Sequence, residues 1–379
     1  MHSFTINNTN ITLPGNSPDK ERKDAEPGSS GDRRRAEGAL ARSVLRRIWE
    51  EGSSFPLVSS KRNTAPIVSL GFLHDDTRLA SCSASGTVRL WESAGLRQSG
   101  GSIDAAGQAM ALSPTERILA VGSTRGSGEW SVVFWDVEVW QPIRAVPVPG
   151  SVQALAYAPD GRTVAVRSAG GARVHLVSPL TGKRLRTLGP EQDGGTPSSG
   201  GRQLVAFSPD GRLVATTNRS GTGVVFLDFV TGKAVGPPLV GTAQHSNAVT
   251  SFLFGERPLK FEALAFSPDG RIAATCGGDR TVRLWDVERR EQIADPLTGH
   301  RRGVNAVAFS PNGRLLASGG NDKRVLLWDV AQHKQAGPAL TGHTKPVVSV
   351  AFSSDDRVLA TGSVDRTVRL WIAPPASRR

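Results

Sequence analysis

Cysteine is scarce in this sequence, because only Cys82 and Cys276 occur among 379 residues. Two cysteines supply neither a disulfide scaffold nor the ligands of a thiolate zinc site. Long hydrophobic runs are also missing, since no stretch approaches the roughly 18 continuous apolar residues of a membrane span. The opening residues MHSFTINNTN lack the basic region and the apolar run of a signal peptide. We therefore expect a cytoplasmic protein without a membrane segment.

Positive charge is in excess, with a formal net charge of +12 and a pI near 10.5. The excess is +2 over residues 1–50, +4 over 51–255 and +6 over 256–379, and the only dense basic run is Arg33-Arg34-Arg35. Proteins that bind nucleic acid without sequence preference concentrate charge into a patch that displaces several counterions. Because the charge here is spread along the chain, nucleic acid is not the expected partner.

One phrase recurs along the chain, an alternating apolar run that ends in an aromatic residue and a turn. Its clear copies are Val205–Gly211, Leu264–Gly270, Val307–Gly313 and Val350–Asp356. Its weaker copies are Leu70–Asp76, Met110–Glu116 and Leu155–Gly161. The seven copies follow one another at 40 to 59 residues, and each leads after 19 to 23 residues to a further apolar run such as TVRLWDV. This self-similarity predicts a repeat architecture.

Each copy is typical of short antiparallel strands joined by tight turns. Val, Leu, Ile and Thr alternate with polar residues, and Pro-Asp-Gly and Thr-Gly-Lys separate the runs. Proline presets φ at the first turn position, and glycine supplies the position that needs a positive φ. A fourth strand is expected between repeats, as in KRLRTLG after Gly182. Four strands per repeat form one blade of a β-propeller.

The chain resembles the WD40-repeat family in Gly299-His300, Asp322 and Trp328-Asp329, and again in Gly342-His343, Asp365 and Trp371. The resemblance covers about 53–375 and implies an all-β fold, a seven-bladed WD40 β-propeller. The blade repeats are expected near 65–93, 106–138, 151–178, 202–229, 259–288, 300–331 and 343–373. The composition, rich in Ala, Gly, Arg and Val, resembles that of bacterial WD-repeat proteins.

The resemblance also implies a buried hydrogen-bonded relay in each regular blade. Buried polar groups are costly unless they satisfy one another. The implied sets are His300, Ser318, Asp322 and Trp328; His343, Thr361, Asp365 and Trp371; and, without an in-register histidine, Thr275, Asp279 and Trp285. The first four copies keep no full set, so we expect them to depend more on apolar packing and the last three blades to be the most regular.

Residues outside the repeats form an N-terminal extension. Residues 1–31 are rich in Asn, Ser, Gly, Pro and charge and are expected to be disordered. Residues 32–52 predict an amphipathic helix, which either packs on the propeller or binds a partner. Pro374 and Pro375 prevent a further strand after the last copy, so a closing strand is expected near 54–60.

No residue cluster predicts catalysis, and no cofactor or metal is expected. His74, Asp75 and Asp76 occupy a turn position and predict a solvated turn. Cys82 and Cys276 hold equivalent positions in separate repeats and predict small core residues. His300 and His343 lie about one blade apart, too far to share a metal. The sequence therefore predicts a protein that is not an enzyme.

The remaining candidates are surface residues. The expected partner-binding rim consists of Arg280, Arg301, Arg302, Lys323, Arg324, Lys345 and Arg366, together with Trp130 in a longer loop on the same face. Basic groups around a rim attract acidic or phosphorylated segments. We therefore expect a monomeric scaffold for protein–protein interactions, in bacteria often alongside signalling kinases. The alternatives are a hydrolase or lactonase-like propeller enzyme and nucleic-acid binding through the basic rim.

Overall fold

The computed structural model describes residues 65–93, 97–105, 107–125, 128–169, 173–189, 202–241 and 259–372. The predicted disordered segment 1–31, the helix 32–52 and the closing strand near 54–60 lie outside the described residues. In the part of the chain that is described, the regular elements are β-strands, and none of it contains a helix long and apolar enough to cross a membrane.

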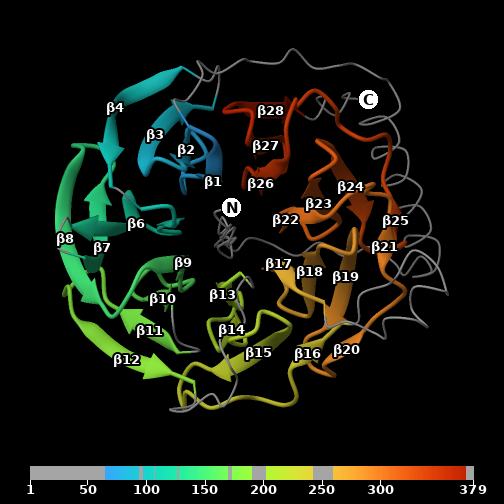
Figure 1. The fold of residues 1–379 in the computed structure, drawn as a ribbon, viewed down its shortest axis with the longest axis horizontal. Coiled ribbons are helices and arrows are strands. Elements are labelled where there is room, and N and C mark those ends of the chain that lie inside the picture. The colour runs from blue at the N-terminus through green and yellow to red at the C-terminus, as the bar shows by residue number, and fades with distance from the viewer. Residues whose placement is uncertain are drawn as a thin grey trace, which may run out of the picture.

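The strands form seven sheets arranged in a ring, which confirms the predicted all-β seven-bladed propeller (Figure 1). The first four blades contain β1 (Ile67–Phe72), β2 (Arg78–Ser83), β3 (Thr87–Glu92) and β4 (Gln98–Asp104); β5 (Met110–Leu112), β6 (Ile118–Arg125), β7 (Glu129–Asp136) and β8 (Gln141–Val148); β9 (Val152–Tyr157), β10 (Val164–Ser168), β11 (Val174–Val177) and β12 (Arg184–Leu188); and β13 (Val205–Phe207), β14 (Leu213–Thr217), β15 (Gly223–Asp228) and β16 (Leu239–Val240).

The last three blades contain β17 (Phe261–Phe266), β18 (Ile272–Gly277), β19 (Thr281–Asp286), β20 (Glu291–Gln292) and β21 (Leu297–Thr298); β22 (Val304–Phe309), β23 (Leu315–Gly320), β24 (Val325–Asp329) and β25 (Lys334–Gln335); and β26 (Val347–Phe352), β27 (Val358–Ser363) and β28 (Val368–Ile372). Within each blade, consecutive strands pair antiparallel in chain order, and β20 and β21 share β19 as their partner. The first strand of each blade lies toward the centre of the ring (Figure 1).

Each of the Pro-Asp-Gly and Pro-Asn-Gly turns at Gly211, Gly270 and Gly313 packs against the turn of the preceding blade. Gly211, Gly270 and Gly313 all have φ near +70°, a conformation that glycine adopts without strain. A Cβ on Gly211 would lie 3.6 Å from the ring of Pro159 in the preceding blade, and Gly270 and Gly313 meet Pro209 and Pro268 in the same way. The recurring phrase therefore specifies both a turn and a contact between blades.

The ring closes where blade 7 meets blade 1. Ile67 and Leu70 pack with Ala351 and Leu370 in one buried cluster, and the backbone N–H of Leu70 donates to Ser349 Oγ over 3.1 Å. Asp76 accepts a hydrogen bond from the backbone N–H of Ser354 over 2.8 Å. The predicted solvated turn at His74–Asp76 is thus exposed at His74 but docks on blade 7 through Asp76.

Apolar residues fill the spaces between blades. Cys82 and Cys276 are fully buried, and each thiol lies within 3.5 Å of a carbonyl oxygen of the next blade, that of Gly107 or of Val304. Burial raises the pKa of Cys82 to about 12, and burial likewise raises that of Cys276. A buried thiol with a raised pKa is a poor nucleophile, so both cysteines contribute packing.

Candidate functional site

Blade 6 places four polar side chains in one chain of hydrogen bonds. His300 precedes β22, and its Nδ1 lies 3.0 Å from Asp322 Oδ1 in the turn between β23 and β24. The Nε2 of the same ring lies 2.8 Å from Ser318 Oγ. Trp328 on β24 donates from Nε1 to the same Ser318 oxygen over 2.8 Å. Both ring nitrogens of His300 are therefore occupied by structural partners.

Blade 7 repeats the arrangement with threonine in place of serine. His343 Nδ1 lies 2.9 Å from Asp365 Oδ2, and Nε2 lies 2.8 Å from Thr361 Oγ1. Trp371 donates to Thr361 Oγ1 over 2.9 Å. Burial lowers the pKa of His343, although Asp365 opposes this. Burial alone would raise the pKa of Asp365, but hydrogen bonds from His343, Thr367 and the Thr344 backbone lower it below its usual range.

Blade 5 uses an arginine where the other two blades use histidine. Trp285 donates to Thr275 Oγ1 over 2.7 Å, as the relay pattern requires. Asp279 forms an ion pair with Arg283, with Nη1 and Oδ2 2.7 Å apart and both side chains almost fully buried. Sequence reasoning missed Arg283, because the same TVRLW run carries an arginine in the first and last copies, Arg89 and Arg369, and so gave no distinguishing signal.

The first four blades keep parts of this pattern. Trp91 in blade 1 donates to Ser81 Oγ over 2.8 Å. In blade 2 the equivalent second-strand residue is Val121, and the buried Nε1 of Trp135 has no hydrogen-bond acceptor among the described residues. Blade 3 has Val166 and Val177 at the two positions, both fully buried. These blades replace the relay with apolar contacts or leave it incomplete.

The relay aspartates also shape the exposed turns beside them. Asp322 Oδ2 accepts the backbone N–H of Arg301 over 2.8 Å, and Asp365 Oδ2 accepts that of Thr344 over 2.9 Å. The residue after each relay aspartate has a positive φ, 73° at Arg280, 68° at Lys323 and 72° at Arg366. The buried carboxylate thus fixes both the entry loop and the turn, from which long basic side chains project.

The basic residues of the predicted rim lie in the entry loops and turns of blades 5, 6 and 7. Arg324 is half-buried. The other six are exposed, namely Arg280, Arg301, Arg302, Lys323, Lys345 and Arg366. A Cβ on Gly303 in the entry loop of blade 6 would lie 3.2 Å from the Cα of Gly278, so this loop contacts the turn of blade 5. Asn305 connects blade 6 to blade 7 through the Val347 carbonyl over 2.9 Å. We call these seven residues the basic rim.

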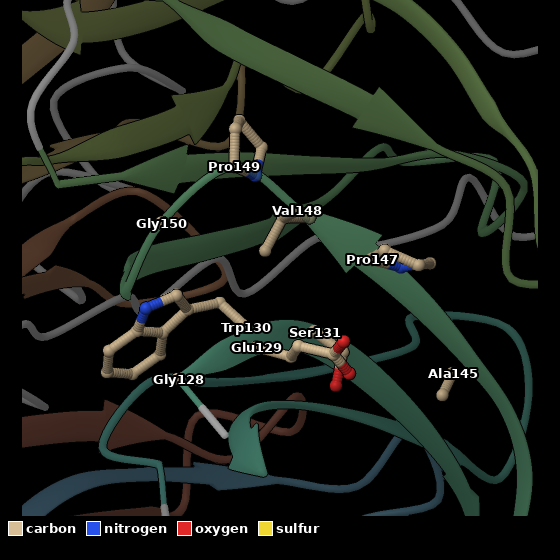
Figure 2. A pocket seen from close by; sticks show the side chains of 9 residues that line it. All are labelled: Gly128, Glu129, Trp130, Ser131, Ala145, Pro147, Val148, Pro149 and Gly150. Carbon is tan, nitrogen blue, oxygen red and sulfur yellow. The ribbon is translucent and has the colours of Figure 1, made fainter. Parts of the chain in front are cut away.

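Trp130 does not belong to the basic rim. It lies on β7 of blade 2, across the ring from blades 6 and 7 (Figure 1), and it is half-buried rather than exposed at a loop tip. The expectation of an exposed loop tryptophan is therefore wrong, because β6 and β7 extend farther than predicted and include Thr124 and Trp130 as a cross-strand pair. Its ring instead forms one wall of a groove beside β8 (Figure 2).

The innermost strands carry one carboxylate that sequence reasoning overlooked. Glu262 on β17 forms an ion pair with Arg202, with Nε and Oε2 2.7 Å apart. Burial raises the pKa of Glu262, and Arg202 opposes this. Among the described residues, no group of three or more His, Cys, Asp or Glu side chains could hold a metal ion. Glu262 therefore joins blade 5 to blade 4 instead of standing free in the channel.

Comparison with known proteins agrees with this architecture. The model of the WD40 family, described as "WD domain, G-beta repeat", matches residues 56–92, 239–286, 291–329 and 336–371. No curated protein matches the chain. The matched segments include the relay residues of blades 5, 6 and 7, whose hydrogen bonds are described above. In these four segments the chain is similar to the WD40-repeat family, and the remaining described strands complete the same ring of blades.

Proposed function

We propose that this protein is a non-catalytic scaffold whose basic rim binds acidic or phosphorylated segments of partner proteins. WD40 propellers commonly serve as protein-interaction platforms, and this chain has their architecture. The proposed setting is a bacterial-type signalling assembly in the cytoplasm, in which the propeller acts as a monomer. Composition and repeat regularity support that setting.

The imbalance of exposed charge on blades 5, 6 and 7 is the observation that carries the proposal. Three acidic side chains lie closest to the rim in sequence, and each is buried and paired: Asp279 with Arg283, Asp322 with His300, and Asp365 with His343. The residue that follows each of these aspartates is basic and exposed: Arg280, Lys323 and Arg366. Because buried carboxylates offer little to solvent, the rim presents positive charge that an acidic partner can neutralise.

The chemistry of the interior favours a scaffold over an enzyme. His300 and His343 use both ring nitrogens in the relay, so neither is placed to act as a general base. The carboxylate of Glu262 is held by Arg202. A propeller hydrolase would need such groups to converge unpaired on the channel.

Nucleic acid is the second candidate partner, since a basic rim also attracts a phosphate backbone. Among the described residues, the turns on the opposite face do not continue the rim's charge, because they combine arginine with aspartate, as in Asp210 and Arg212. A compact rim fits a short acidic segment better than an extended duplex.

Affinity capture with matched charge reversals tests the proposal. The rim variant R280E/K323E/R366E should lose the proteins that the unmodified protein captures from extracts of its source cells. The control R162E/R212E/R314E reverses the same number of exposed basic residues on the opposite face and should retain these proteins. Loss of nucleic acid alone from the rim variant, or equal capture by both variants, would contradict a protein-binding rim.

A further inference from the structure

A groove on the outer side of blade 2 has no role in the proposed function. It encloses about 630 Å³. Its lining comes from the start of β7 and from the end of β8 with the loop that follows: Gly128, Glu129, Trp130, Ser131, Ala145, Pro147, Val148, Pro149 and Gly150 (Figure 2). Trp130 and Val148 are cross-strand partners, so two paired strands hold the walls in place.

The walls of the groove combine flat apolar rings with one unused donor. Trp130 packs against the buried cluster between blades 2 and 3 but stays half-exposed toward the groove. Pro147 and Pro149 are exposed on the other side (Figure 2). Within the described part of the chain, the indole N–H of Trp130 has no hydrogen-bond acceptor, although its nitrogen is open to solvent. A ligand that fits here must supply both an apolar ring and a carbonyl oxygen.

The groove also carries charge of one sign. Of the described residues that line it, only Glu129 is charged, and it is exposed. Its carboxylate has no ion-pair partner among the described residues. An occupant with a basic residue at this end gains an ion pair, whereas an acidic occupant is repelled.

We infer that this groove binds a proline-rich segment of a partner protein in the polyproline II conformation, with a basic residue beside Glu129. A polyproline II segment has no internal hydrogen bonds, so its carbonyl oxygens are free to accept from the Trp130 indole N–H. A helix has its carbonyl oxygens occupied along its length. Pro142 and Pro147 remove two donors from the edge strand β8, which disfavours the addition of a β-strand. Proline rings stacked on an indole are the recognition mode that remains.

This groove lies on blade 2, whereas the basic rim lies on blades 5, 6 and 7 (Figure 1). The two surfaces prefer opposite charges, acidic segments at the rim and a basic proline-rich segment at the groove. A scaffold with both surfaces can hold two different partners at once. The inference does not depend on the proposed function, since the rim variant R280E/K323E/R366E should keep the groove intact.

Fluorescence anisotropy with a labelled PPAPPRR peptide tests the inference on the full chain. The unmodified protein should bind the peptide, and W130F, which keeps an aromatic ring but removes the N–H, should weaken binding about fivefold. E129Q should weaken binding of PPAPPRR about threefold but leave a PPAPPAA peptide unaffected. W140F alters another half-buried tryptophan of blade 2 and should change nothing.

Three results would overturn the inference. The first is the absence of binding at about 1 mM peptide, the weak end of measurable affinity. The second is equal binding by W130F and the unmodified protein, with thermal unfolding showing both folded. The third is tighter binding of PPAPPEE than of PPAPPRR, which would contradict the role of Glu129.

Discussion

Hydrogen-bonded polar side chains fill the relay positions inside blades 6 and 7, whereas mainly apolar side chains fill those of blades 2 and 3. In blades 6 and 7 a buried hydroxyl accepts from a tryptophan and contacts a histidine, which is paired with an aspartate. Blade 3 has valine at both the hydroxyl and the tryptophan positions, Val166 and Val177. Blade 2 keeps Trp135 but has lost its acceptor. A blade interior can be filled by a complete hydrogen-bonded set or by apolar side chains alone. Blade 2 has neither, because it contains the tryptophan donor without a hydroxyl acceptor.

The difference also determines what each region can present to partners. The relay aspartates fix the turns from which Lys323 and Arg366 project, so a stable interior and an ordered rim depend on the same carboxylates. Blade 2 has no such relay, and its surface feature is instead the groove beside Trp130. This difference between the blades can be tested by substitution and by changing the pH.

The largest effect is expected from removing a relay carboxylate. D322A leaves the His300 ring and the Arg301 N–H without their buried acceptor and should cost about 3 kcal/mol in the free energy of unfolding. S85A removes an exposed hydroxyl at the equivalent turn of blade 1 and should cost under about 0.5 kcal/mol. Urea unfolding followed by circular dichroism measures both. Similar losses in the two variants would show that the relay blades are not special.

A smaller and opposite effect is expected from completing blade 2. The Val121–Val133 pair lies two residues along the ladder from the Leu119–Trp135 pair, as Thr361–Arg369 lies two residues from Leu359–Trp371. V121T should therefore give the Trp135 N–H an acceptor and stabilise the protein by about 0.5–1 kcal/mol. The control V166T places a hydroxyl in blade 3, where no tryptophan can donate to it, and should destabilise by about 1 kcal/mol. Destabilisation by V121T would contradict the inference that a hydroxyl at this position can accept from the Trp135 N–H.

The smallest effect is the contribution of the relay to the pH dependence of stability. Burial lowers the pKa of His343 below its ordinary value of 6.5, so the unfolded chain takes up a proton there before the folded chain does. The stability from this group is present above pH 6.5 and is lost as the pH falls through the folded pKa. Burial raises the pKa of Asp322 and Asp365, but the hydrogen bonds from the histidines and from neighbouring N–H and O–H groups together lower both pKa values below 3.8, so a second loss follows below that pH.

Unfolding midpoints measured across pH test this order of events. H343Q should reduce the loss that begins near pH 6.5, because the pKa of the half-buried His175 is also lowered and its share of the loss remains. The loss below pH 3.8 should persist in H343Q, and H74Q, which changes an exposed histidine of blade 1, should keep both steps. A first step of unchanged size in H343Q would assign the effect to another group.

The fold could be predicted from the sequence because each repeat contains the strands and turns of one blade. The alternating runs and Pro-Asp-Gly turns predicted seven blades, since each turn specifies a strand reversal and a contact with the next blade. His300, Ser318, Asp322 and Trp328 were predicted as one set because the resemblance to the WD40-repeat family implies it. Contacts between blades were not predictable in the same way. The Arg202–Glu262 and Asp76–Ser354 pairs join residues from different repeats, and no local pattern records them.

The position of Trp130 shows where local patterns mislead. A longer loop was predicted over residues 124–130, but the hairpin pairs through Arg125 and Glu129. The length of a strand depends on how far its partner strand continues the hydrogen-bonded ladder. The turn residues alone do not indicate this length. The groove beside Trp130 follows from that longer hairpin.

Hydrogen exchange with an acidic probe tests the account most directly. The protein is mixed with a polyglutamate peptide at low ionic strength, and amide exchange is compared with and without the peptide. The account predicts added protection at the turns around Arg280, Lys323 and Arg366 and none at the opposite-face turns around Arg162 and Arg212. Protection spread evenly over both faces, or absent from blades 5, 6 and 7, would contradict the basic rim as the binding surface.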